Sequence, residues 1–193
     1  MDPYLLVKFL HIASVIAAFV AAGILHAALL RLRAAEDARS ARSAVATLAR
    51  VGPKMPLFLL ALMLTGGWLT QLHWSFNLPF AGIGIVGLLV MGAVSGVVVK
   101  PRTRAIYARL AKVEGTLDVE HRALVRDPTL WAAAHIPAPL AAGIVFDMVV
   151  KPGWAGSLGA VAVAVALGMV PVLMSQSAPV AAAALSEEGA GIQ

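Results

Sequence analysis

Long apolar runs without charged residues alternate along the chain with short basic segments. Lys, Arg, Asp and Glu are absent from residues 55–72, 75–99, 128–146 and 153–185, and residues 9–30 hold only two histidines as ionisable groups. Each run approaches or exceeds the roughly 20 residues that a helix needs to cross the hydrocarbon core of a bilayer. We therefore expect five membrane-spanning helices, near residues 4–30, 55–74, 79–99, 129–150 and 156–176.

The fold class that this pattern predicts is all-α: a polytopic transmembrane helical bundle with a four-helix core plus one further helix. We expect a single bundle over residues 1–177 and a flexible tail over residues 178–193. The composition agrees, because 60% of the residues are hydrophobic and 13% are charged, whereas a soluble domain is about a quarter charged. The chain begins with the acidic sequence MDPY and its first apolar stretch is longer than a signal-peptide core, so we expect that stretch to be a retained helix.

The basic residues predict how the bundle is oriented. All but two of the 15 lysines and arginines, namely all but Lys8 and Lys151, fall between helices one and two or between helices three and four. The positive-inside rule assigns both connections to the cytoplasm. We therefore expect the N-terminus outside, the C-terminus in the cytoplasm, and a bacterial-type inner membrane as the location. The net charge of +5 then reflects topology, and no nucleic-acid partner is expected.

The two basic connections carry helical patterns. We expect helix one to continue past the membrane, and Ile106, Leu110 and Val113 mark an apolar stripe at helical spacing in the second connection. That stripe is typical of a helix that lies along an anionic leaflet, or else of a solvated connecting helix. Two prolines in helix four, Pro137 and Pro139, and Pro171 in helix five should kink or loosen those helices.

Polar side chains gather at one predicted depth. Ionisable residues inside a span cost about 2.5–3.5 kcal/mol each on insertion scales, so each one is a candidate functional residue. Helix one runs inward and helices two and four run outward, which brings five side chains to one outer layer: Lys8, His11, His73, Asp147 and Lys151. Asp147 is the natural ion-pair partner for either lysine in that layer.

Two more histidines, His26 and His135, lie toward the inner side. His26 is about 22 Å below His11 on the same helix and faces roughly the same way. In one interpretation His11 is an axial ligand of haem b, opposite His73 or a group on helix four, because neutral imidazole is the usual haem ligand in helical bundles. A two-haem arrangement would add His26 and His135 as the inner pair. In the other interpretation these histidines are interfacial or hydrogen-bonded packing residues.

Short motifs carry a resemblance to known membrane proteins. The sequence K-F-L-H-I at residues 8–12 and V-V-K-P at residues 149–152 resemble the first and last helices of the HemJ-type protoporphyrinogen oxidases. The stretch that contains T-G-G-W-L at residues 65–69 is similar to a predicted integral membrane family of unknown function, related to CopD-like membrane domains. This resemblance implies a haem b bound through His11, with roles for Lys8, Lys151 and Pro152. The fifth helix departs from the four-helix pattern of the oxidases.

The leading functional hypothesis is therefore a membrane b-type haem protein that takes part in electron transfer or haem-linked redox chemistry. In this hypothesis His11 ligates the iron and quinone is a partner. The protein would act as an oxidoreductase if it is an enzyme. An accessory or assembly subunit of a larger respiratory complex, or a homo-oligomer, is the alternative, since the small-residue faces of helices three and five could dock other helices. A transporter of small solutes or metals is the third. Cysteine is absent, and no triad, P-loop or dinucleotide motif is visible, which argues against thiolate, hydrolase and nucleotide chemistry.

Overall fold

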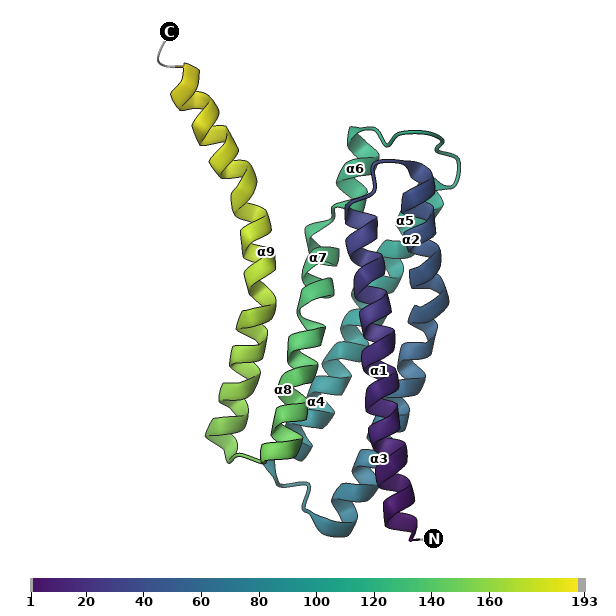
Figure 1. Ribbon diagram of the computed structural model, residues 1–193, viewed down its shortest axis with the longest axis vertical. Helices are drawn as coiled ribbons and strands as arrows, with labels where there is room; N and C mark the ends of the chain where they lie inside the picture. The colour runs from purple at the N-terminus through teal and green to yellow at the C-terminus, as the bar shows by residue number, and fades with distance from the viewer. Residues whose placement is uncertain (1, 191–193) are drawn as a thin grey trace.

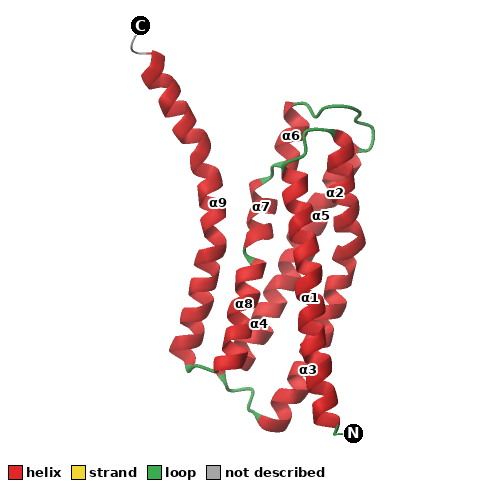
Figure 2. Cartoon of the chain, viewed as in Figure 1, coloured by secondary structure: helices red, strands yellow, loops and turns green. Residues whose placement is uncertain are grey.

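The computed structural model describes the backbone of residues 2–190 and the side chains of residues 2–175. The described residues form helices and no strand, apart from one isolated bridge between Asp37 and Thr116. In chain order the elements are α1 (Pro3–Arg33), α2 (Ala38–Val51), η1 (Gly52–Lys54), α3 (Met55–His73), α4 (Pro79–Ala93), the π-helix η2 (Val94–Val99), α5 (Lys100–Leu110), α6 (Val119–Val125), α7 (Pro128–His135), α8 (Pro137–Val150) and α9 (Trp154–Ala190) (Figures 1 and 2).

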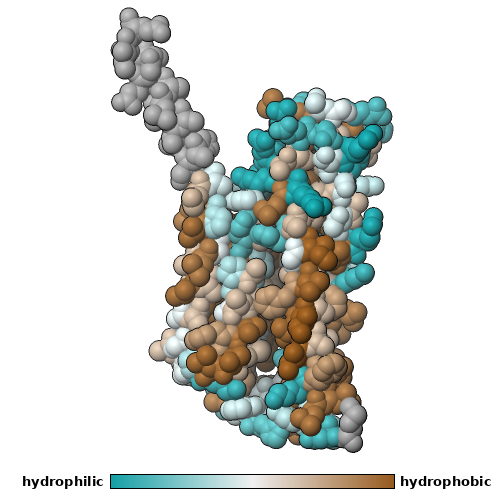
Figure 3. Space-filling model, in the orientation of Figure 1, coloured by the Kyte–Doolittle hydropathy of each residue, from teal (hydrophilic) through white to brown (hydrophobic). Residues whose placement is uncertain are grey.

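Five helical stretches of the described chain are long and apolar enough to cross a membrane, which confirms the predicted fold class. They are Pro3–Arg33, Ala38–His73, Pro79–Leu110, Val119–Val150 and Trp154–Ser175. In the view of Figure 3, hydrophobic side chains form a band over the middle part of the bundle, and hydrophilic ones gather at the upper end around α2, α5 and α6 and again at the lowest end. The protein is thus a multi-pass membrane protein. The predicted flexible tail, 178–193, lies outside the residues whose side chains are described, and 191–193 lie outside the described backbone.

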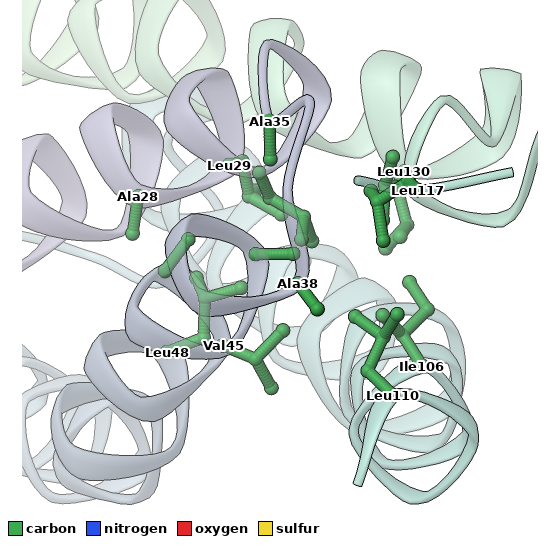
Figure 4. Packing of buried hydrophobic residues seen from close by; sticks show 14 of the residues in the cluster. Ala28, Leu29, Ala35, Ala38, Val45, Leu48, Ile106, Leu110, Leu117 and Leu130 are labelled. Carbon is green, nitrogen blue, oxygen red and sulfur yellow. The ribbon is translucent and has the colours of Figure 1, made fainter. Parts of the chain in front are cut away.

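The upper end of the bundle, made of the turn 34–37, α2, α5 and α6 and called the basic end below, is a folded extension of the membrane helices. Residues of α2 spaced three or four apart, such as Ala38, Ala41 and Val45, are buried in one hydrophobic cluster with the end of α1 and with α5 (Figure 4). Ile106 and Leu110 belong to this cluster. The apolar stripe of the second basic connection is therefore buried against α2, and it does not lie on a lipid leaflet.

Side-chain hydrogen bonds stabilise the turns of the basic end. Helix α1 ends at Arg33, and the chain reverses so that Asp37 caps α2 by accepting from the Ser40 amide at 2.9 Å. The Arg42 guanidinium donates to the carbonyl oxygens of Leu110 and Val113 at 2.9 and 2.6 Å. The Leu110 carbonyl lies at the end of α5, where helix carbonyl groups have no partner from a following helical turn, and Val113 lies in the turn after it. Helix α1 therefore extends to Arg33, and the chain then reverses direction and continues as α2.

The fourth span is broken in its middle. Helix α7 ends at His135 and α8 begins at Pro137, because Pro137 and Pro139 have no amide hydrogen to continue the backbone ladder. The π-helix η2 packs against α7, and short π segments in helices are frequent at functional sites. The predicted effect of Pro137 and Pro139 is confirmed, whereas α9 runs through Pro171 without interruption.

Candidate functional site

His11 is held between α1 and α3. Its Nδ1 lies 2.9 Å from Oγ1 of Thr65, and the Thr65 hydroxyl donates its one proton to the Ala61 carbonyl at 2.6 Å. Thr65 can therefore only accept from His11, so Nδ1 carries the imidazole proton and Nε2 keeps a free lone pair. A Cβ on Gly66 would lie 3.0 Å from Cε1 of His11, so a glycine there lets the ring lie against α3. The K-F-L-H-I and T-G-G-W-L motifs thus meet at one contact.

Lys8 and His73 lie nearer the N-terminal end of the bundle, and both are exposed. The His73 ring contacts the Tyr4 ring edge to face at 4.5 Å between centroids, and Nζ of Lys8 lies 5.8 Å from the same Tyr4 ring. Tyr4 and His11 are seven residues apart on α1, which is about 10 Å along the helix. The structure does not bring His11 and His73 together as a pair.

Lys151 and Asp147 occupy two different environments. Nζ of Lys151 lies over the rings of Trp74 and Phe80, at 4.4 and 5.7 Å from their centroids. The Asp147 carboxyl is fully buried, and among the described side chains it forms no ion pair with Lys8 or Lys151. The five residues of the predicted outer layer are thus divided among three separate contacts and one buried carboxyl.

The inner histidines, His26 and His135, are brought together. Their ring centroids lie 5.1 Å apart with an interplanar angle of 78°. The Nδ1 of His26 lies 2.8 Å from the Ala134 carbonyl oxygen, and the Nδ1 of His135 lies 2.9 Å from the Trp131 carbonyl oxygen. A carbonyl oxygen only accepts, so each Nδ1 carries the proton and each Nε2 has a free lone pair. The pair joins α1 to the point where α7 ends.

Trp131 and Arg33 complete the inner group, although neither was a candidate from the sequence. The Trp131 ring lies 4.0 Å from the His135 ring and donates its Nε1–H to the Pro171 carbonyl at 3.2 Å. The Arg33 guanidinium lies 4.2 Å from the centre of the Trp131 ring, a cation–π contact. The available signal was the i to i+4 spacing of Trp131 and His135, which places them on one helix face.

The three membrane-embedded histidines at positions 11, 26 and 135 share one tautomer, with the proton on Nδ1. Each commits its Nδ1–H to an oxygen acceptor, the arrangement that fixes the tautomer of metal-ligating histidines. Within the described residues no three His, Cys, Asp or Glu side chains are grouped to hold a metal ion by themselves. The histidines are therefore suited to ligating iron that already has other ligands, or to proton exchange.

Comparisons of the chain with protein-family models, with curated proteins and with solved structures found no match. Its relation to the HemJ-type oxidases and CopD-like domains stays a prediction carried by short motifs. A helical bundle hosts many activities, so the fold alone does not indicate a function.

Proposed function

We propose that this protein is a b-type haem protein of the membrane that takes part in electron transfer or haem-linked redox chemistry. The observation that carries the proposal is the orientation of His11, whose Nδ1–H is committed to Thr65 and whose Nε2 is left as a ligand. Quinone is the proposed partner, and the proposed location is a bacterial-type inner membrane with the basic end in the cytoplasm. The proposed orientation of the bundle in the membrane rests on the distribution of lysine and arginine along the chain.

His11 would hold a haem iron through its Nε2. Its ring is half-buried, and the Thr65 hydroxyl sets its tautomer, just as hydrogen-bond acceptors on Nδ1–H do for imidazoles that ligate a metal. His73 does not supply the opposite ligand in this arrangement, because its ring packs on Tyr4, one to two turns away along α1. The inner pair is not an axial pair either, because rings in contact leave no space for a porphyrin plane between them. Bound haem would supply one-electron redox chemistry at a potential set by its ligands and surroundings.

The chain's own residues would orient and balance that group. Thr65 keeps the His11 ring in one rotation, and Gly66 leaves the space that the ring needs. Lys8 lies one turn from His11 on α1 and is exposed, so its ammonium group is placed to meet a propionate carboxylate. Lys151 is the second cation at this end of the bundle. No catalytic residue is assigned by these contacts.

The absorption spectrum of the purified protein tests the proposal. We expect a Soret band in detergent, directly or after haem reconstitution, that His11→Ala removes and Thr65→Val weakens. His121→Ala is the matched control, because His121 lies at the basic end and bonds only to its own cap residue Asp118. Loss of the band in His26→Ala but not in His11→Ala would show that a histidine of the inner pair, and not His11, binds the haem iron.

Absence of any Soret band after reconstitution would reject the haem proposal. Stable co-purification with a respiratory enzyme, without a chromophore, would then favour an accessory or assembly subunit. Uptake of a solute by proteoliposomes would instead favour a transporter.

A further inference from the structure

Asp147 is a buried carboxyl group that nothing in the structure neutralises. It lies in α8, its exposed fraction is 0%, and among the described side chains its two carboxyl oxygens are the buried polar atoms without a hydrogen-bond partner. Most buried polar side-chain atoms in proteins have a partner, so an exception calls for an explanation. The haem proposal makes no use of this residue.

Close helix packing keeps water away from this carboxyl. One turn before Asp147, the Gly143 position lies so close to α9 that a Cβ there would be 3.1 Å from Cβ of Ala164. On the other side, a Cβ on Gly84 of α4 would be 3.1 Å from the Met148 side chain. Small residues at both contacts let the backbones approach closely. Asp147 therefore lies inside the α4–α8–α9 contact.

Charged groups that could neutralise a carboxylate are absent from the neighbouring helices. Neither α4 nor α9 up to Ser175 contains an ionisable residue, and the ionisable residue of α7 is His135, about 18 Å from Asp147 along the span. Lys151 is the closest cation in sequence, at the left-handed end of α8. Its Nζ lies over Trp74 and forms no ion pair with Asp147. Burying an unpaired carboxylate is strongly unfavourable, even after relaxation, so the neutral acid is the form that this site accommodates.

The Ser157 hydroxyl also suits a neutral acid. Ser157 is fully buried and lies against the Asp147 carboxyl, and its hydroxyl donates to the Pro152 carbonyl at 3.3 Å. Its proton is thus already used, and its oxygen is left to accept from a carboxylic O–H. A carboxylate has no proton to donate and would require Ser157 to give up Pro152. Neither carboxyl oxygen of Asp147 has a hydrogen-bond partner among the residues that the structure describes, so a protonated Asp147 would have to turn its O–H toward the Ser157 oxygen.

We propose that Asp147 is a proton-binding site within the membrane, and that its ligand is an exchangeable proton. At neutral pH the group is the carboxylic acid, with its O–H directed at Ser157. On release the O–H bond breaks, the proton passes to water at the N-terminal end of the bundle, and the carboxylate draws the Lys151 ammonium off the Trp74 ring. Lys151 lies directly after α8, four residues from Asp147, and its long flexible side chain has the reach for this movement. The site does not require haem.

Infrared spectroscopy of the full-length protein in detergent, without haem, tests this site. We expect a protonated-carboxyl C=O band at neutral pH that moves on exchange into D2O and is lost in Asp147→Asn. Asp118→Asn is the matched control and should leave the band unchanged, because Asp118 is an exposed carboxylate that accepts hydrogen bonds from His121. In Lys151→Met, which removes the counter-charge, the band should persist to a higher pH than in the wild type.

Carboxyl-13C-aspartate in the wild-type chain makes the test independent of any folding defect in the variants. A protonated-carboxyl band that shifts with this label supports the site, since the other aspartates are exposed or accept hydrogen bonds. A wild-type spectrum at neutral pH without a label-sensitive band would show an ionised Asp147 and overturn the proposal. A band that Asp118→Asn removes would overturn it as well.

Discussion

The imidazole of His26 lies 5.1 Å from the imidazole of His135, edge to face, across the contact of α1 with the end of α7. The two residues are more than a hundred positions apart in the chain, and each ring is held by a backbone carbonyl. One of these carbonyls belongs to Ala134, next to the break between α7 and α8. The histidine pair therefore stabilises the interrupted span from the side.

Replacing His26 by leucine should destabilise the protein. The Ala134 carbonyl would lose its donor in an apolar setting, which costs about 1–3 kcal/mol for a buried acceptor. Thermal unfolding in detergent measures the change. His73→Leu is the matched control, because His73 is exposed and surface changes usually stay within about 0.5 kcal/mol. Equal effects of the two substitutions would contradict the structural role of His26.

The neighbouring glycines Gly66 and Gly67 should respond oppositely to alanine. Nothing lies within 4 Å of a Cβ on Gly67, so Gly67→Ala should stabilise α3 by about 0.5–1 kcal/mol through helix propensity. A Cβ on Gly66 would push on the His11 ring and weaken the hydrogen bond to Thr65, which is worth about 1 kcal/mol. Unfolding of both variants in the same detergent tests this, and a Gly66→Ala protein as stable as Gly67→Ala would refute it.

Gly168 of α9 should tolerate no side chain. A Cβ there would lie 3.0 Å from the His135 carbonyl oxygen and 3.0 Å from Cα of Ile136. Both are backbone atoms at the break between α7 and α8, so neither can turn aside as a side chain would. We expect Gly168→Ala to cost about 1–3 kcal/mol, as overpacking does. Gly159→Ala on the same helix, where nothing lies within 4 Å, is the control and should be neutral or stabilising.

The basic end should loosen in acid. Hydrogen bonds from the backbone N–H and the side chain of His121 hold the pKa of Asp118 below its usual value, and Ser40 lowers the pKa of Asp37 in the same way. A carboxyl whose pKa is lower in the folded state contributes stability above its unfolded pKa, about 3.9, and loses it as the pH falls through the folded pKa. The protection of α6 amides against hydrogen exchange, corrected for the intrinsic exchange rate at each pH, should therefore fall below about pH 4. In Asp118→Ala, which removes the cap of α6, this protection should already be low at neutral pH and should lack the step.

The number of spans was predictable from the sequence because the bilayer imposes it, whereas three of the helical stretches, Ala38–His73, Pro79–Leu110 and Val119–Val150, extend well past the predicted limits at the basic end. A helix must satisfy its backbone hydrogen bonds internally and needs about 20 apolar residues to cross, so uncharged runs mark the spans. The interruption near Pro137 was predictable for a similar local reason, since proline lacks the amide hydrogen. The packing of the basic end was not predictable. An apolar stripe such as Ile106 and Leu110 could be buried against a lipid leaflet or against another helix, and only the fold places α2 against it.

The sequence by itself determined the level of each polar residue along the bundle. Rise per residue and span limits are local quantities, and Lys8, His73 and Lys151 do lie at the same end of the helices as Tyr4 and Trp74. Only the tertiary structure decided the partners of these residues. The rotation of a membrane helix about its axis depends on how it packs against its neighbours. That rotation turns His11 to Thr65, joins His26 to His135, and leaves Asp147 buried beside Ser157 rather than paired with a lysine.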